Sequence, residues 1–138
     1  MTYVLDTHVL FWLLTGNEKL PLSVRERLAD DHCRWVIPAM VVAEFVDLIV
    51  KGRTKVTLEE LQTSLRKDAR IRIEAMDEVV AYLGGSLSTL ADIHDRCIVA
   101  TTLCVLATER ETALVTADRD IRNCGLVPVI WESNAGDV

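Results

Sequence analysis

The stretch Tyr3-Val-Leu-Asp-Thr-His-Val-Leu-Phe-Trp-Leu-Leu-Thr-Gly16 sets the pattern on which the rest of the chain is built. Its first three residues are aromatic or aliphatic and predict a short β-strand, which ends at Asp6. Residues 8–15 are apolar nearly all round and predict a buried helix, which Gly16 ends. A buried strand followed by a buried helix is the repeating unit of a parallel α/β sheet.

The same alternation of short strands and helices continues along the chain. Further strands are predicted at residues 35–37, 71–73, 113–116 and 127–130, and helices at 23–30, 40–51, 78–83, 92–109 and 119–123, with one more starting at Thr57. Because parallel neighbours need crossover connections, this order implies parallel pairing. We therefore expect an α/β fold: a three-layer α/β/α sandwich with a central parallel sheet of about five short strands. One domain should span residues 1–138, with a frayed tail at 131–138.

Local signals predict several helix boundaries. Ser23-Val-Arg-Glu26 and Thr57-Leu-Glu-Glu60 both have the spacing of a capping box, in which the first side chain accepts a hydrogen bond from a backbone N–H of the first turn. Each is therefore predicted to open a helix. Gly84-Gly85 is predicted to break or bend the helix that follows Asp77, because glycine is a poor helix former.

The composition predicts a cytoplasmic protein with no membrane association. Half of the 138 residues are hydrophobic, which is enough for a core without disulfide or metal support. The longest charge-free run, residues 97–108, is too short to cross a bilayer, and the amino terminus lacks the pattern of a signal peptide. The four cysteines form no CxxC pair and no zinc-finger spacing with histidine, so we expect free thiols.

The net charge of −6 argues against broad affinity for nucleic acid. One segment is different, because residues 51–72 contain seven basic and three acidic side chains, a local charge of +4. A positive face of this kind suits contact with a phosphate backbone. A solvated helix surface explains the segment equally well.

Four acidic residues lie within or at the ends of apolar stretches: Asp6, Glu44, Asp95 and Asp118. Carboxylates are costly to bury alone, so acids in such settings are expected to share a cation or a substrate, or to lie at helix ends. Asp6 and Asp118 follow predicted strands, and ligand sites of parallel sheets lie beyond the carboxyl ends of strands.

Each acid also has a purely structural explanation when it is taken alone. Glu44 and Asp47, three residues apart, could form the polar stripe of a half-buried helix. Asp95 could be the third residue of a helix that Asp92 caps, where the helix dipole favours an acid. Asp118 could make the local hydrogen bonds of a turn.

Taken together, the four acids predict a metal site better than four separate structural roles. They come from two strand ends and two helices that can face the same edge of one sheet. Carboxylate oxygens are the ligands that Mg²⁺ and Mn²⁺ prefer, and such ions keep water and substrate phosphate oxygens in their coordination shell. A site of this kind can activate water for attack on a phosphodiester.

Four motifs together resemble a known family. They are Leu5-Asp6-Thr7, Ala43-Glu44, Asp92-Ile-His-Asp95-Arg96 at the start of a long Ala- and Thr-containing helix, and Leu114-Val-Thr116-Ala-Asp118-Arg-Asp120. In this order and spacing they resemble the PIN domain, most closely the small VapC-type toxins of bacterial type II toxin–antitoxin modules. The resemblance covers essentially the whole chain. It departs at Ile93, where many relatives have proline, and at Ala39, where a Ser or Thr often caps the helix.

The resemblance implies a Mg²⁺- or Mn²⁺-dependent endoribonuclease that cleaves RNA by metal-activated water and leaves 5′-phosphate and 3′-hydroxyl ends. Carried over by motif position, the catalytic residues are Asp6, Glu44, Asp95 and Asp118, with Asp6 and Asp95 as direct metal ligands. Asp120 is the alternative to Asp118, as Asp92 is to Asp95. The supporting residues are Thr116, which would position Asp118 or touch phosphate, and Arg96, which would reach RNA phosphate or pair with a carboxylate.

The resemblance also implies partners: an RNA substrate, a cognate antitoxin and a second copy of the chain in a homodimer. In such proteins an early helix contributes to the antitoxin groove, which would make Trp12 either an interface anchor or a core residue. His8 is predicted to be structural. A haloacid-dehalogenase-like phosphotransferase is excluded because His8 stands where a second aspartate is needed. The remaining alternative is a PIN-like binding module that does not cleave.

Overall fold

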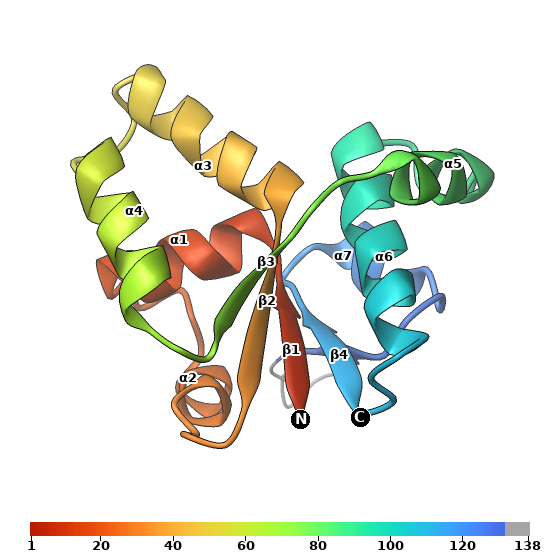
Figure 1. Ribbon diagram of the computed structural model, residues 1–138, viewed down its shortest axis with the longest axis horizontal. Helices are drawn as coiled ribbons and strands as arrows, with labels where there is room; N and C mark the ends of the chain where they lie inside the picture. The colour runs from red at the N-terminus through yellow and green to blue at the C-terminus, as the bar shows by residue number, and fades with distance from the viewer. Residues whose placement is uncertain (132–138) are drawn as a thin grey trace.

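The carboxyl ends of five parallel strands lie at one edge of a sheet in the computed structural model, which describes residues 1–131 (Figure 1). The strands are β1 (Thr2–Leu5), β2 (Arg34–Pro38), β3 (Ile71–Glu74), β4 (Thr112–Val115) and β5 (Val129–Ile130). Their order is β3-β2-β1-β4-β5, and every neighbouring pair is parallel. The predicted fold class is therefore confirmed.

Helices cover both faces of this sheet (Figure 1). One face carries α1 (Thr7–Thr15), α2 (Leu22–Leu28), α3 (Ala39–Val50) and α4 (Leu58–Lys67), and the other carries α5 (Glu78–Ser86), α6 (Ile93–Leu106) and α7 (Arg119–Asn123). The chain moves outward from β1 to β3, then crosses to β4 on the far side of β1. The strand order thus reverses between β1 and β4, which is where parallel sheets bind ligands.

The apolar strands and the uncharged run in α6 contribute side chains to the hydrophobic core. Val4, Leu5, Val36 and Leu114 on the central strands are completely buried, and Phe45 of α3 is the largest fully buried side chain. Full burial of one such side chain contributes about 1.5–3 kcal/mol. No helix within residues 1–131 is long and apolar enough to span a bilayer.

Two predicted helix boundaries were wrong. Ser23 does not cap α2, because the helix already begins at Leu22 after Pro21, and the cap position makes no side-chain hydrogen bond. Gly84-Gly85 does not break α5, which continues to Ser86. Gly84 is buried against α6, where an added Cβ would lie 3.7 Å from the carbonyl carbon of Arg96. Close helix packing therefore offsets the weak helix propensity of glycine.

Other boundaries agree more closely with the sequence. Thr57 caps α4 by accepting a hydrogen bond from the Glu60 backbone N–H at 3.1 Å. The last strand is shorter than predicted, since only Val129 and Ile130 pair with β4. Of the predicted frayed tail at 131–138, residues 132–138 lie outside the described part of the chain.

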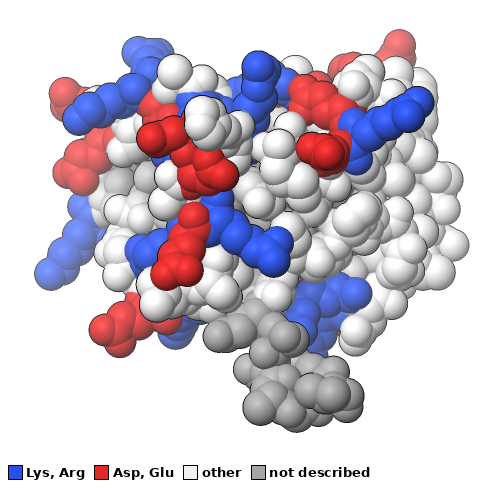
Figure 2. All heavy atoms as spheres, turned by 90° about the horizontal axis from the view of Figure 1, so that it is seen from below, with Lys and Arg blue, Asp and Glu red and all other residues white. Residues whose placement is uncertain are grey.

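The predicted positive segment is partly neutralised. Lys51 lies 2.8 Å from Asp47, Arg70 lies 2.8 Å from Asp68, and Arg72 lies 2.7 Å from Glu109. The exposed basic side chains at 53, 55, 66 and 67 carry the rest of its charge. Figure 2 shows the face at the amino-terminal ends of the strands, where side chains of both signs are interspersed. That face therefore presents no uniform positive surface for a polyanion.

Candidate active site

The four predicted acids line a single cavity of about 80 Å³ at the carboxyl edge of the sheet. Asp6 follows β1, Glu44 lies on α3, Asp95 lies in the first turn of α6, and Asp118 follows β4 and precedes α7. The strand order places β1 beside β4, so residues 112 positions apart meet at the switch point. The topology thus brings the predicted quartet together.

Asp6 is the most buried member of the quartet, with 5% of its surface exposed. Its Oδ1 accepts a hydrogen bond from the Val9 backbone N–H at 2.9 Å, which caps α1, and its Oδ2 accepts one from the Thr116 hydroxyl. Burial raises the pKa of Asp6, and the hydrogen bonds from Thr116 and Val9 oppose that rise. These two donors hold the carboxylate in place while burial favours its neutral form.

Thr116 links two of the acids. Its hydroxyl donates to Asp6 and accepts a hydrogen bond from the backbone N–H of Asp118 at 3.0 Å. The side chain is completely buried. Thr116 therefore positions Asp6 directly and Asp118 through the backbone, and it does not face the solvent side where a phosphate would arrive.

Burial and neighbouring charges also act on Asp95. Burial, followed by the charges of Asp118, Asp92 and Glu44, raises the pKa of Asp95 from 3.8 to about 6. Asp92 caps α6 by accepting from the Asp95 backbone N–H at 3.1 Å, so the predicted helix geometry is present. Asp92 itself is not among the residues that line the cavity. The helix end thus places Asp95, and not Asp92, toward the other acids.

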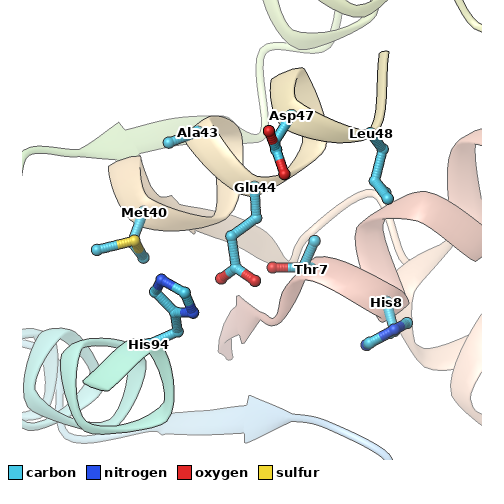
Figure 3. A pocket seen from close by; sticks show the side chains of 8 residues that line it. All are labelled: Thr7, His8, Met40, Ala43, Glu44, Asp47, Leu48 and His94. Carbon is cyan, nitrogen blue, oxygen red and sulfur yellow. The ribbon is translucent and has the colours of Figure 1, made fainter. Parts of the chain in front are cut away.

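Glu44 and Thr7 present polar atoms that lack partners. Glu44 Oε1 and Thr7 Oγ1 are buried and make no hydrogen bond with another part of the described chain. Both side chains project into the same space between α1 and α3 (Figure 3). A buried polar atom without a partner is rare and marks a place where a ligand, ion or water belongs.

The remaining predicted residues are placed differently. Asp118 Oδ1 accepts from the Ile121 backbone N–H at 3.0 Å and caps α7. Asp120 is exposed on α7 and does not line the cavity. The guanidinium of Arg96 donates to the carbonyl oxygens of Leu90 and Ala91 at 2.9 and 2.8 Å, so it holds the loop before α6. Arg96 is directed away from the acids.

The donor set fits a hard divalent cation. The cavity holds carboxylate oxygens whose charges repel one another, and one buried carboxylate oxygen has no partner. Within residues 1–131, no three Asp, Glu, His or Cys side chains are already close enough to hold an ion.

Sequence reasoning missed three side chains at this edge. Thr7 and His8 line the carboxylate cavity and the cavity beside it, and His94 lines the latter. His8, which was predicted to be structural, lies in the first turn of α1, and its interaction with Asp6 lowers the pKa of that carboxyl group. Their position in the sequence was the available signal. Residues that directly follow an acid at the end of a strand, in the first turn of the next helix, stay at the carboxyl edge of the sheet.

A protein-family model of the PIN domain matches residues 3–125. The chain belongs to the PIN-domain family. A search of curated proteins found no match. PIN domains are generally nucleases.

Solved structures share the fold of this PIN domain at low sequence identity. A chain in the structure of VapBC2 from Rickettsia felis, bound to a DNA fragment from their promoter, is 17% identical, with a TM-score of 0.65, and the match covers 96% of this chain and 100% of that one. A chain of DNA-bound VapBC from Salmonella typhimurium is 19% identical, with a TM-score of 0.63 and coverages of 94% and 97%. At these identities the likeness shows a common fold.

Proposed function

We propose that this PIN domain is a metal-dependent endoribonuclease that hydrolyses RNA phosphodiester bonds, and that it is the toxin of a toxin–antitoxin pair. The observation that carries the proposal is the convergence of four carboxylates from four elements in one cavity at the switch point of the sheet. Membership of a nuclease family supports the reaction type. The fold shared with chains of VapBC complexes supports the toxin assignment.

The roles of the acids follow from their surroundings. Asp6 and Asp95 are the proposed ligands of Mg²⁺ or Mn²⁺, since one is fixed by two hydrogen bonds and the other bears the repulsion of its neighbours. Glu44, with its free Oε1, completes the donor set or orients the attacking water. Asp118, which also lines the cavity, would hold a second metal ion or a metal-bound water. When bound, the cation lowers the pKa of water and offsets the charge that develops on the phosphate.

RNA cleavage tests this function directly. A mixed RNA pool is incubated with the protein and Mg²⁺ or Mn²⁺, and the ends of the products are mapped. We expect 5′-phosphate and 3′-hydroxyl ends, with activity lost in EDTA and reduced at least about 100-fold in Asp6→Asn and Asp95→Asn, because both remove charge needed to hold the cation. The exposed Glu18→Gln variant is the matched control, since it neutralises an acid outside the cavity.

The outcome separates the proposed enzyme from a binding module. Equal cleavage by the unmodified protein, both variants and the EDTA sample would refute the metal mechanism. A folded sample that cleaves no RNA with either metal would favour the non-cleaving PIN-like module. Comparing Asp118→Asn with Asp120→Asn identifies the fourth acid, and we expect the larger loss at Asp118 because it lines the cavity.

The proposed protein partners are an antitoxin and a second copy of this chain. The VapBC complexes with the same fold support the antitoxin. Co-expression with the neighbouring reading frame, followed by purification and light scattering, tests both partners. A stable complex that suppresses RNA cleavage is the expected result for an antitoxin, and a mass of two chains for the protein alone is expected for the homodimer.

A further inference from the structure

A second cavity lies directly beside the carboxylate cavity, between α1, α3 and the first turn of α6 (Figure 3). Its volume is about 310 Å³, and it shares Thr7, His8 and Glu44 with the carboxylate cavity. A strand whose scissile phosphate lies at the carboxylates therefore has a neighbouring nucleotide within reach of this space. The volume lies at the lower end of the range for small-molecule sites.

The walls of this cavity suit the flat faces of a base. Met40 and His94 lie next to each other at one end, and Leu48 and His8 lie at the other, with Glu44 between them (Figure 3). Aliphatic side chains and an imidazole ring are surfaces against which unpaired bases pack and stack. The cavity is also open at its rim, where His94 is exposed, so an unpaired base can enter it.

The cavity walls contain two carboxylates, which accept hydrogen bonds, beside a hydroxyl and two imidazoles, which can donate as well as accept. Glu44 Oε1 is buried without a partner, and Asp47 contributes a second carboxylate, of which Oδ2 lies 2.8 Å from Lys51 Nζ. Thr7, only 8% exposed, adds a hydroxyl oxygen that is also without a partner. No Lys or Arg side chain is among the residues that line this space. The cavity therefore disfavours a phosphate and favours a neutral group with several N–H donors.

We propose, on the basis of the ribonuclease function above, that this cavity is a subsite for the base next to the scissile phosphate and that it selects guanine. Guanine presents adjacent N1–H and N2–H donors on one edge, which a carboxylate can accept together. Uracil presents a single N–H between two carbonyl oxygens, which the carboxylates repel. Asp47 is the specificity-determining residue, because it supplies a carboxylate to this cavity and lies outside the carboxylate cavity.

Binding of single nucleotides tests the subsite without any cleavage. The four nucleoside 5′-monophosphates, which differ only in the base, are titrated into ¹³C- and ¹⁵N-labelled protein in EDTA and followed by NMR. We expect the side-chain signals of Met40, Leu48 and His94 to shift, and guanosine monophosphate to bind at least about fivefold more tightly than uridine monophosphate. Asp47→Asn should remove most of this preference, because the amide replaces one acceptor with a donor.

A filled cavity provides the matched control. Leu48→Trp places a large ring in the space and should abolish the shifts, whereas Val50→Trp on the same helix should leave them unchanged, because Val50 is 78% exposed and lies outside the cavity. Equal affinity for all four nucleotides would overturn the guanine selection. Absence of shifts at the cavity, or their persistence in Leu48→Trp, would overturn the subsite.

The two proposals can fail independently. Guanine-selective binding by a protein that never cleaves RNA would refute the ribonuclease function and leave the subsite standing. Conversely, metal-dependent cleavage without any base preference next to the cut, equal in the unmodified protein and Asp47→Asn, would refute the subsite and leave the enzyme standing.

Discussion

One hydroxyl controls the position of two acids in the candidate active site. Thr116 donates to the buried carboxylate of Asp6 and accepts from the backbone of Asp118. A hydrogen bond to a charged group contributes about 1.5–3 kcal/mol, and its loss leaves a buried carboxylate without a donor. Thr116 therefore couples the stability of the fold to the geometry of the site, although it does not itself reach the substrate.

Replacing this hydroxyl should damage both stability and activity. We expect Thr116→Val to lower the free energy of unfolding by about 1–3 kcal/mol in urea denaturation, whereas Thr116→Ser should stay near the unmodified protein. Because the Thr116 hydrogen bond lowers the pKa of Asp6, its loss should also move the acid limb of the pH–activity profile to higher pH. Equal profiles for the Val and Ser variants would contradict the positioning role.

The sequence predicted the acids of the site better than their neighbours. Buried carboxylates are costly, so Asp6 and Glu44 in apolar stretches were visible without a structure. Thr7 and His94 give no comparable signal in the sequence, because a threonine or histidine in the first turn of a helix is ordinary. Their importance depends on the gap between α1, α3 and α6, which only the packing of the three helices creates.

Helices and strands were predictable where a local signal agreed with the tertiary packing. Thr57 caps α4 as its sequence indicates, and residues 97–102 of the uncharged run 97–108 are buried. The predictions were wrong where tertiary packing, and not a local sequence signal, determines where a helix begins or ends. Ser23 does not cap α2, because Pro21 already occupies the cap position. The α5 helix continues through two glycines because it packs against α6.

The continuous α5 helix leads to a stability prediction at its second glycine. Gly85 is exposed, has helical backbone and would place a Cβ in open space. We expect Gly85→Ala to stabilise the protein by about 0.5–1 kcal/mol, through helix propensity and reduced freedom of the unfolded chain. Gly16→Ala should instead destabilise it, since Gly16 has a φ of 66° that favours glycine. Thermal denaturation of both variants measures the difference, and a loss of stability in Gly85→Ala would contradict it.

The whole molecule combines a net charge of −6 with a concentration of carboxylates at one edge of the sheet. Such an edge attracts cations and repels a polyanion. A bound divalent cation would offset this negative charge and so favour the approach of RNA to the acids.

Neutralising Asp95 should change the stability of the protein, because it removes the repulsion between the Asp95 carboxylate and the acids around it. The pKa of Asp95 is raised to about 6 in the folded protein, so the folded state binds the proton more tightly than the unfolded state, and the free energy of unfolding falls as pH rises from about 4 to 6. In EDTA at pH 7.5, Asp95→Asn should therefore stabilise the protein by about 1 kcal/mol, after discounting for the screening of this half-exposed group. The gain should vanish near pH 4, where the carboxyl group is protonated in both states.

Mg²⁺ or Mn²⁺ should raise the melting temperature of the unmodified protein and not that of the variant. Glu18→Gln is the control for a general charge effect, and a variant that is destabilised at both pH values would show that the carboxylate supports the metal-free fold.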